Sequence, residues 1–358
     1  MVTLDDPSAA FVQGLSYPVH ALGPSVGIYG FNFKMLPWLK KNLGRFDGIV
    51  VGGLWQYHSI ALWMATQNLS HRYVVFPHGM LDPYFNRAYP LKVIKKFPYW
   101  FFAERLLLRD AYRVLFTSES EQKLAAESIW HCKGNGLVVP YGTLGPNRAP
   151  EPLRSAFFRL LPQLEGKRFL LYLGRIHEKK GCDLLIEAFA KHAASDPALH
   201  LVIAGPDNSG WSKKLQALAT RLGVADRITW PGMLSGDPKW GAFYAAEAFI
   251  LPSHQENFGI AVAEALACSL PVLISDQVNI FEEVERDGAA LVAPDTLEGT
   301  ADLIGRWIAL SPEKRTRMQM AARRSFESRF NTQRLPSIIL SLFEDVATPP
   351  VSIRSSGD

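Results

Sequence analysis

Cysteine is scarce in this 358-residue sequence, and its spacing excludes two common structural devices. The three cysteines lie far apart, and none belongs to a Cys-x-x-Cys pair or to a cluster with histidine. This pattern supports neither a structural zinc site nor a disulfide framework. It is typical of a reducing compartment, so the sequence predicts a cytoplasmic protein.

Long hydrophobic runs are absent as well. No stretch of eighteen apolar residues occurs, so no membrane-spanning helix is predicted. The amino-terminal stretch MVTLDDPSAA has neither the basic start nor the apolar segment of a secretion signal, and secretion is not expected. A composition of 48% hydrophobic and 20% charged residues is that of a globular protein, and the length suits two domains.

Three phosphate-binding motifs are also missing. The sequence contains no P-loop, no Gly-x-Gly-x-x-Gly and no Asp-x-Asp pair that could clamp a divalent ion between phosphates. The first two absences argue against a P-loop NTPase and a standard dinucleotide-binding enzyme. The third predicts that any bound phosphate is met by cationic side chains and helix amides, without a metal ion or another cofactor.

Positive charge is concentrated in one part of the chain. Between residues 34 and 113 there are twelve Lys and Arg but only four Asp and Glu. Aromatic residues are interleaved with these cations in segment 92–109, which predicts peripheral contact with an anionic membrane at the cytoplasmic face. An ordinary solvated basic helix is the alternative. No nucleic-acid-binding motif accompanies the charge, so nucleic acid is not an expected partner.

The second half of the sequence alternates regularly between strand and helix patterns. This alternation predicts an α/β fold with a parallel, doubly wound sheet. The expected strands are 169–174, 199–206, 228–233, 248–253, 271–275 and 289–294, with helices at 182–194, 211–223 and 260–269.

The first half is less regular but of the same kind. Strand-like stretches occur at 47–55, 72–80, 111–118 and 137–142. We therefore expect two Rossmann-like domains, residues 1–150 and 151–335, joined by a segment rich in proline and glycine. A carboxy-terminal helix and tail, residues 336–358, are expected to pack back on the first domain.

Ligands bind beyond the carboxyl ends of strands in such sheets, so the residues just after each strand are the candidates for a site. Arg175 and Lys180 follow the first strand of the second half, where two cations can hold a diphosphate. The loop 256–259 leads into a helix whose free amides can bind an anion. An exposed basic loop is the alternative explanation for the two cations.

Glu264 poses a further question, because it lies in the otherwise apolar helix IAVAEALA. A buried carboxylate costs several kcal/mol unless it is paired. No Lys or Arg lies within one helical turn of Glu264. A partner must therefore come from elsewhere, as a ligand or as backbone donors.

The two glutamates with seven residues between them, in Glu-Asn-Phe-Gly-Ile-Ala-Val-Ala-Glu (256–264), follow Gly-Arg-Ile-His-Glu-Lys-Lys-Gly (174–181) at a characteristic distance. In both motifs the sequence resembles the retaining group 1 (family 4) glycosyltransferases of the GT-B fold, over roughly residues 45–345. The resemblance implies two Rossmann-like domains facing across a cleft. It also implies transfer of a sugar from a nucleotide-diphosphate sugar to a glycan or lipid-linked acceptor, as in exopolysaccharide or lipopolysaccharide assembly.

The resemblance assigns roles to individual residues. Glu264 would bind the ribose, Glu256 the transferred sugar, and Arg175 and Lys180 the diphosphate. His78 would contact the transferred sugar from the first domain, and it is grouped with Glu256, Arg175 and Lys180 as catalytic. The remaining donor-binding candidates are Gly205, Met233, Asn257, Phe258, Gly259 and Ile260, and the acceptor-side candidates are Trp55, His58 and Asp82.

The amino terminus departs from the family pattern. Members begin with a strand and a glycine-rich turn, whereas VTLDDPS here resembles the end of a later strand. The first βα unit is therefore expected to be missing from residues 1–150, which would expose an apolar strand edge. Two alternatives stay open: an inactive pseudo-transferase that still binds the donor, and another GT-B activity such as a nucleotide-sugar epimerase or a phosphorylase.

Overall fold

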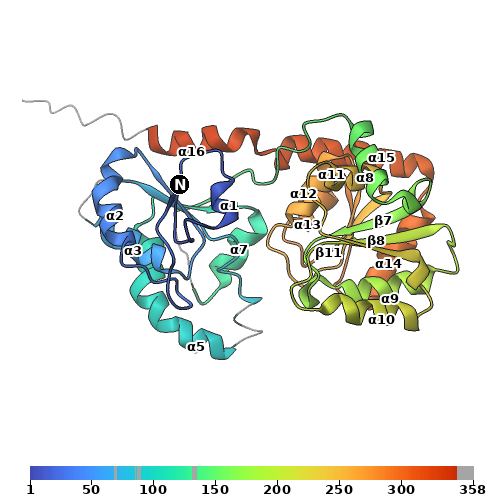
Figure 1. Ribbon diagram of the computed structural model, residues 1–358, viewed down its shortest axis with the longest axis horizontal. Helices are drawn as coiled ribbons and strands as arrows, with labels where there is room; N and C mark the ends of the chain where they lie inside the picture. Colours follow the sequence, from blue (N-terminus) through green and yellow to red (C-terminus); the bar gives the residue numbers. More distant parts are fainter. Residues whose placement is uncertain (68–70, 85, 87–89, 131–134, 345–358) are drawn as a thin grey trace, which may run out of the picture. The chain divides into compact units, whose positions relative to one another are not determined.

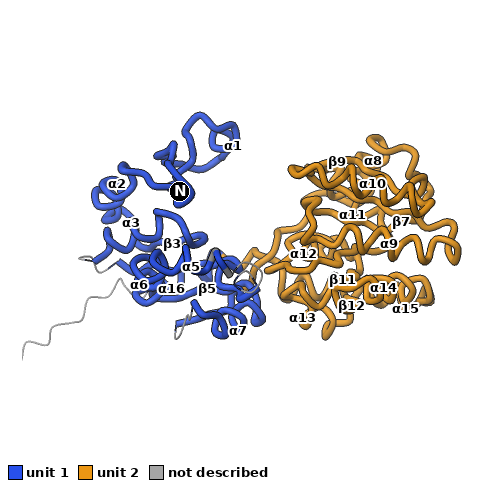
Figure 2. The backbone as a smooth tube through the Cα atoms, turned by 90° about the horizontal axis from the view of Figure 1, so that it is seen from below, with its two compact units in different colours: residues 1–139, 336–358 blue, residues 140–335 orange. Residues whose placement is uncertain are grey.

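The structure is a computed structural model that describes residues 1–344 except 68–70, 85, 87–89 and 131–134. It consists of two compact units (Figure 2). Unit 1 contains residues 1–139 and the carboxy-terminal segment from Pro336, and unit 2 contains Pro140–Leu335. No helix in the described part of the chain is long and apolar enough to cross a membrane.

Unit 2 has a six-stranded parallel sheet with the order β12-β11-β10-β7-β8-β9. The four inner strands, β11, β10, β7 and β8, are rich in Leu, Ile, Val and Phe and are largely buried, as is usual in parallel sheets covered by helices, whereas the edge strands β12 and β9 are only partly buried. All six strands predicted for the second half are confirmed. They are β7 (Arg168–Leu173), β8 (Leu199–Ala204), β9 (Ile228–Gly232), β10 (Ala248–Leu251), β11 (Val272–Ser275) and β12 (Ala290–Ala293).

Helices cover both faces of this sheet. Figure 1 shows α9 and α10 below the strands and α8, α11 and α12 above them. The three helices predicted from the sequence correspond to α9, α10 and α12. The helices of unit 2 are α8 (Pro150–Leu160), α9 (Cys182–His192), α10 (Trp211–Arg221), α11 (Gly236–Ala245), α12 (Ile260–Ala267), α13 (Phe281–Arg286), α14 (Leu297–Ala309) and α15 (Pro312–Ser325).

Unit 1 has its strands in two separate parallel sheets. One contains β3 (Ile49–Gly52), β4 (Tyr73–Phe76), β5 (Arg113–Phe116) and β6 (Gly136–Val138) in that order, and the other contains only β1 (Val2–Thr3) and β2 (His20–Ala21). The four strands of the larger sheet coincide with the strand-like stretches of the sequence. The short β2 has no such signal, because the pairing with β1 rather than its own residues defines it.

The helices of unit 1 surround these sheets. They are α1 (Ala10–Gln13), α2 (Met35–Asn42), α3 (Tyr57–Thr66), α5 (Pro90–Tyr99), α6 (Arg105–Asp110), α7 (Glu119–Glu127) and α16 (Leu335–Glu344), with a π-helical turn η2 (Trp100–Glu104) between α5 and α6. Helix α16 is grouped with unit 1, and its Phe343 ring lies directly against Gly48. A side chain at position 48 would leave no room for this ring.

The division between the units lies at Val139–Pro140, before the expected position at residue 150. The intervening segment packs on unit 2 instead. Thr143 donates its amide to the Phe330 carbonyl over 3.1 Å, and a Cβ on Gly142 would lie 2.0 Å from that same oxygen. Because these contacts are made through the backbone, the sequence did not indicate them.

Gly241 provides a test of helix packing in unit 2. A Cβ added there would lie 2.0 Å from the Leu153 carbonyl oxygen, so α11 approaches α8 through the bare backbone of Gly241. We expect Gly241→Ala to lower the free energy of unfolding of unit 2 by about 1–3 kcal/mol, because the two helices must move apart. Guanidinium unfolding followed by tryptophan fluorescence measures this change.

Gly44→Ala is the matched control, because no atom lies within 4 Å of a Cβ built at that position. Equal stability of the Gly241→Ala protein and the wild type would show that α8 and α11 do not need this close approach.

Candidate functional site

The loops after β7 and β10 meet at one end of the sheet in unit 2. Lys180, from the loop after β7, forms an ion pair with the Glu256 carboxylate in the loop after β10. The His254 amide and the Ser253 hydroxyl both donate to the Lys179 carbonyl, over 2.8 and 2.9 Å. The structure therefore brings together two of the predicted site residues, one cation and one carboxylate.

Two glycines make this arrangement possible. Gly181 has a φ of +65°, and a Cβ there would lie 2.1 Å from the Pro252 carbonyl oxygen. Gly205, at the end of β8, is equally constrained, because its Cβ would lie 1.7 Å from the Gly174 oxygen. The buried Gly205 thus holds the ends of β7 and β8 together through the backbone, whatever further contact it makes.

The amino-terminal ends of α9 and α12 face this loop cluster. Each helix begins at a glycine in the left-handed conformation, Gly181 or Gly259, and neither has a side-chain cap. The neighbouring α10 differs, because Asp207 accepts hydrogen bonds from the Trp211 and Ser212 amides, which holds the pKa of Asp207 below its usual range. The first amides of α9 and α12 are therefore available to bind an anion.

The four residues 257–260 contribute to the site in different ways. Phe258 is buried, and its ring packs edge-on against Tyr141 and Phe330. Its side chain therefore anchors the loop, and only its backbone can meet a ligand. Asn257 is half-buried, whereas the Ile260 side chain is largely exposed.

Glu264 has a partner that sequence reasoning missed. Its Oε1 accepts from the Lys239 ammonium over 2.7 Å, and Lys239 also lies over the Trp240 ring, 4.5 Å from its centroid. Lys239 comes from α11, so a search for cations within one turn of α12 could not find it. The partner expected from the sequence was a ligand or backbone donors, not a cation from another helix; this ion pair reduces the cost of burying the carboxylate.

Arg175 and Met233 are exposed at the same end of the sheet. The Tyr172 hydroxyl donates to the Arg175 carbonyl over 2.8 Å and fixes the backbone from which the guanidinium projects. Burial raises the pKa of Tyr172 well above its usual value, so this phenol stays protonated. Met233 directly follows β9 and is 71% exposed. Both side chains are thus free to reach a ligand.

Unit 1 has two strained residues directly after its strands. Trp55 follows β3 with a φ of +68°, and His78 follows β4 with a φ of +49°, which is uncommon for residues other than glycine. The Trp55 indole donates to the Met80 carbonyl over 3.2 Å and joins the two loops. Such strain is concentrated at functional sites, where surrounding contacts hold it in place.

Two buried glutamates provide these contacts. Glu104 accepts from the Trp55 amide over 2.6 Å, and Glu121 accepts from the Gly79 amide, next to His78, over the same distance. Burial raises the pKa of Glu104 to about 7. Neither glutamate follows a strand, so sequence reasoning did not select them as positioning residues.

The remaining first-half candidates lie close to these loops. His58 is held by the Gly53 carbonyl at 3.3 Å, and Asp82 is buried and accepts from the Tyr84 amide over 2.7 Å. Burial lowers the pKa of both His58 and His78, so both imidazoles are neutral at pH 7. Lys96 lies 4.2 Å from the centroid of the Trp55 ring.

Comparison with known proteins finds a matching protein family for each part of the chain. The family model described as "Glycosyl transferases group 1" matches residues 155–325, and that described as "Glycosyl transferase 4-like domain" matches residues 1–142. A D-inositol 3-phosphate glycosyltransferase of Thermomonospora curvata is 38% identical over 161 residues, which is 43% of this chain and 37% of that protein. The corresponding protein of Nocardiopsis dassonvillei is 30% identical over 61% of this chain and 52% of its own length. The chain thus spans about half the length of these relatives, or less.

Solved structures share the fold. The crystal structure of Anabaena Alr3699/HepE in complex with UDP and glucose aligns with a TM-score of 0.71 at 19% identity, over 90% of this chain and 84% of that one. A glycosyltransferase from Rickettsia africae aligns with a TM-score of 0.74 at 15% identity, over 95% and 88%. The chain belongs to the group 1 (family 4) glycosyltransferases, and its two Rossmann-like units are those of the GT-B fold.

Proposed function

We propose that this protein transfers a sugar from a nucleoside-diphosphate sugar to an acceptor hydroxyl, with retention of configuration at the anomeric carbon. The observation that carries the proposal is the cluster in unit 2, where Lys180, Glu256 and the uncapped end of α12 come together. Cations and free amides suit a diphosphate, and a carboxylate suits sugar hydroxyls. The Anabaena neighbour, solved with UDP-glucose, is consistent with a donor of this class.

In the proposed reaction the bond between the anomeric carbon and the diphosphate oxygen breaks as the acceptor oxygen bonds to the same face of that carbon. The acceptor proton passes to the leaving phosphate oxygen. Arg175, Lys180 and the helix amides stabilise the negative charge that develops on the leaving group. His78 and Glu256 orient the sugar, and the strained backbone at His78 supports a role in positioning.

The Lys180–Glu256 ion pair has a consequence for donor binding. When the donor binds, the Lys180 ammonium group must share its hydrogen bonds between the Glu256 carboxylate and the diphosphate. This releases one Glu256 carboxylate oxygen for a sugar hydroxyl. Donor binding therefore exchanges one internal ion pair for two contacts with the ligand. Glu264 behaves differently, because Oε1 stays on Lys239 while Oε2 accepts from the ribose.

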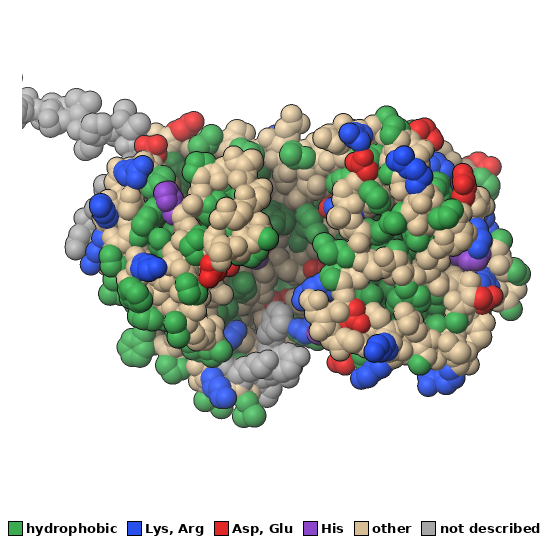
Figure 3. All heavy atoms as spheres, viewed as in Figure 1, with side chains coloured by type: hydrophobic (Ala, Val, Ile, Leu, Met, Phe, Trp, Pro, Cys, Tyr) green, Lys and Arg blue, Asp and Glu red, His purple; other side chains and the backbone are tan. Residues whose placement is uncertain are grey.

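The acceptor is proposed to be a glycan or lipid-linked molecule at an anionic membrane surface. Apolar side chains project from α5 and η2 and are largely exposed, namely Leu91, Ile94, Phe97, Phe101 and Phe102. Figure 3 shows such hydrophobic side chains beside Lys and Arg in this region. This combination suits an interfacial contact. Trp100 and Glu104 are buried instead, so these two residues of segment 92–109 do not belong to the proposed surface.

A second loop widens this surface. Tyr29 stacks on Tyr99 of α5 with 4.6 Å between ring centroids, which holds segment 26–33 beside that helix. Four apolar residues of this segment are exposed, namely Val26, Ile28, Phe31 and Phe33. A single exposed apolar residue is ordinary, but two adjacent segments with nine exposed apolar side chains favour a binding surface.

Three other functions remain candidates. A pseudo-transferase would bind donor without turnover, and the interrupted sheet of unit 1 is the observation that favours it. An epimerase or phosphorylase would use the same donor site. Release of nucleoside diphosphate that depends on added acceptor supports the transferase over all three.

Glu264→Gln tests the donor site. The change removes a charged acceptor of ribose hydrogen bonds, each worth about 1.5–3 kcal/mol, so donor affinity should fall about tenfold to a hundredfold. Isothermal titration calorimetry with UDP and UDP-glucose measures this loss. Glu282→Gln, at an exposed position in the first turn of α13, is the matched control.

Removal of Lys239 separates ribose binding from the ion pair. The double variant Lys239→Met, Glu264→Gln leaves no unpaired cation at this position, unlike Glu264→Gln alone. The loss of donor affinity should therefore persist, while the free energy of unfolding should recover. Unchanged nucleotide affinity in both Glu264 variants would refute the ribose assignment.

Activity should not depend on a divalent metal. The proposed site meets the diphosphate with Arg175, Lys180 and helix amides, and the sequence has no Asp-x-Asp pair. Turnover in excess EDTA should therefore equal turnover in Mg²⁺ or Mn²⁺. Loss of turnover in EDTA that either ion restores would contradict this cationic site.

The membrane surface can be tested by charge removal. Lys95→Gln with Arg105→Gln removes two exposed cations worth about 1 kcal/mol each near anionic lipid, so binding should weaken about thirtyfold. Sedimentation with phosphatidylserine vesicles at low salt measures it. Lys213→Gln with Lys214→Gln, on α10 of unit 2, is the control. Equal pelleting of both double variants would show that α5 does not contact lipid.

A further inference from the structure

Tyr172 places one hydroxyl group in an otherwise apolar stretch of β7. From Phe169 to Leu173 this strand contains only Phe, Leu and the tyrosine, and the Tyr172 side chain is fully buried. A phenylalanine would fill the same space without a polar group. Because a buried hydroxyl is costly unless it forms hydrogen bonds, its partners show what it contributes.

The Tyr172 hydroxyl holds one peptide group in the loop after β7. It donates to the Arg175 carbonyl over 2.8 Å. The amide of the same peptide group belongs to Ile176, and it donates to the Pro206 carbonyl over 3.0 Å. The planar peptide between Arg175 and Ile176 is therefore held on both sides, and it cannot turn without breaking one of these two hydrogen bonds.

The Cys182 thiol holds the phenol in turn. Cys182 is the first residue of α9, is fully buried and forms a hydrogen bond with the Tyr172 side chain. Burial raises the pKa of this thiol to about 12, so it stays protonated and donates to the phenol oxygen, while the phenol donates to Arg175. A Cβ built on Gly174 would lie 3.3 Å from the same oxygen, so the loop passes close to the phenol.

The phenol is close to the charged groups of the proposed donor site. The charges of Glu256 and Arg175 both act on it, and the Arg175 side chain is itself exposed. The backbone on either side of a Cα atom sets the direction of its side chain, so the peptide that Tyr172 holds limits where the Arg175 guanidinium can reach. Arginine binds phosphate through a planar fork, and this contact depends strongly on direction.

We propose that Tyr172 is a positioning residue for the donor diphosphate, because it holds the Arg175 backbone so that the guanidinium meets the phosphate oxygens. Tyr172 does not touch the ligand, since its side chain is fully buried. The inference rests on the proposed donor site and adds a residue that acts on the phosphates through another residue. Loss of the hydroxyl should therefore weaken binding of the diphosphate and leave binding of the nucleoside unchanged.

Tyr172→Phe removes the hydroxyl and keeps the ring. The affinity of the full chain for UDP should fall about tenfold, as expected when a charge-assisted hydrogen bond to phosphate is lost. The affinity for uridine should not change, because uridine has no phosphate for Arg175 to meet. Isothermal titration calorimetry measures UDP binding, and competition against UDP measures uridine binding.

Arg175→Gln shows whether the effect passes through the guanidinium. If Tyr172 acts through Arg175, the double variant Tyr172→Phe, Arg175→Gln should lose no more UDP affinity than Arg175→Gln alone. If the two losses multiply instead, Tyr172 acts independently of Arg175 and the proposal is overturned.

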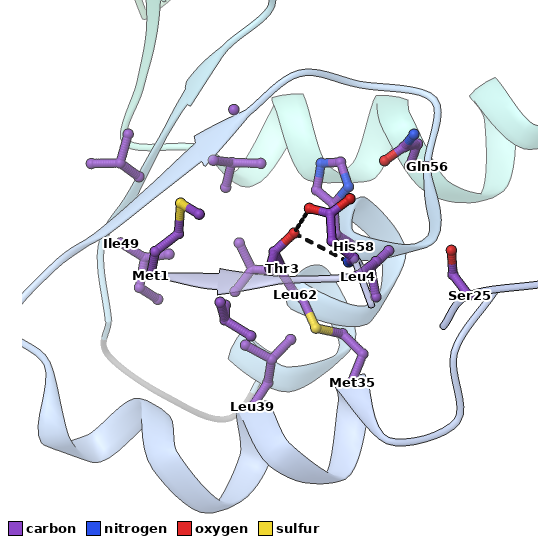
Figure 4. A pocket seen from close by; sticks show the side chains of 15 residues that line it. Met1, Thr3, Leu4, Ser25, Met35, Leu39, Ile49, Gln56, His58 and Leu62 are labelled. Atoms are coloured by element: carbon purple, nitrogen blue, oxygen red, sulfur yellow. Dashed lines mark hydrogen bonds between the residues drawn. The ribbon is translucent and has the colours of Figure 1, made fainter. Parts of the chain in front are cut away.

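Two control variants separate positioning from stability. The Tyr244 hydroxyl also forms a hydrogen bond with a thiol, that of Cys268, so Tyr244→Phe removes a similar group elsewhere in unit 2 and should leave UDP affinity unchanged. Leu39 lines a pocket of unit 1 together with Met35 and Leu62 (Figure 4). Leu39→Val should lower stability, because it removes a buried methylene group, without changing UDP affinity.

Cys182 provides a second test if Tyr172→Phe does not fold. Cys182→Ala removes the donor to the phenol and should also weaken UDP binding more than uridine binding. Cys182→Ser replaces the thiol by another donor and should retain the wild-type affinity for UDP.

Two further results would overturn the proposal. An equal fall in the affinities of Tyr172→Phe for UDP and uridine would show that the hydroxyl only stabilises unit 2. Unchanged UDP affinity would show that Arg175 is positioned without it. If the wild type binds UDP no more tightly than uridine, the failure lies instead with the proposed diphosphate site, and this inference falls with it.

Discussion

The site in unit 2 depends on the close contact between Gly181 and the carbonyl of Pro252. No residue with a side chain can stand at this position, because its Cβ would overlap the oxygen. The contact brings the loop after β7 against the loop after β10, and only then can Lys180 reach Glu256. It also places the beginning of α9 against the loop that leads into α12, so that cationic, anionic and amide groups lie close together.

Much of the fold could be predicted because parallel sheets leave a strong pattern in the sequence. The strands of unit 2 are short runs of apolar residues separated by helices of matching length, and all six were found. The selection of Lys180 and Glu256 as site residues followed from the same logic, since both lie in loops that follow strands. Periodicity in the chain and the geometry of strand ends were sufficient for these features.

The features that could not be predicted depend on tertiary contacts without a local pattern. Lys239 neutralises Glu264 from a different helix, and nothing in the residues around either side chain indicates it. Glu104 and Glu121 hold the strained loops after β3 and β4 from helical positions. The strand β2 contains two residues and is defined only by its partner. In each case the determining interaction joins residues that are remote in sequence.

The elevated pKa of Glu104 links the stability of unit 1 to protons. A carboxyl with a pKa of about 7 in the folded protein and about 4.5 in the unfolded chain binds more protons when folded between these values. The free energy of unfolding therefore decreases as the pH rises from about 4.5 to about 7, by about 3 kcal/mol for a shift of this size. Near neutral pH the Trp55 loop is thus held by a carboxyl that is only partly ionised. Modest acidification would therefore stabilise the folded state of unit 1, while it weakens the hydrogen bond from the Trp55 amide, which favours the ionised carboxylate.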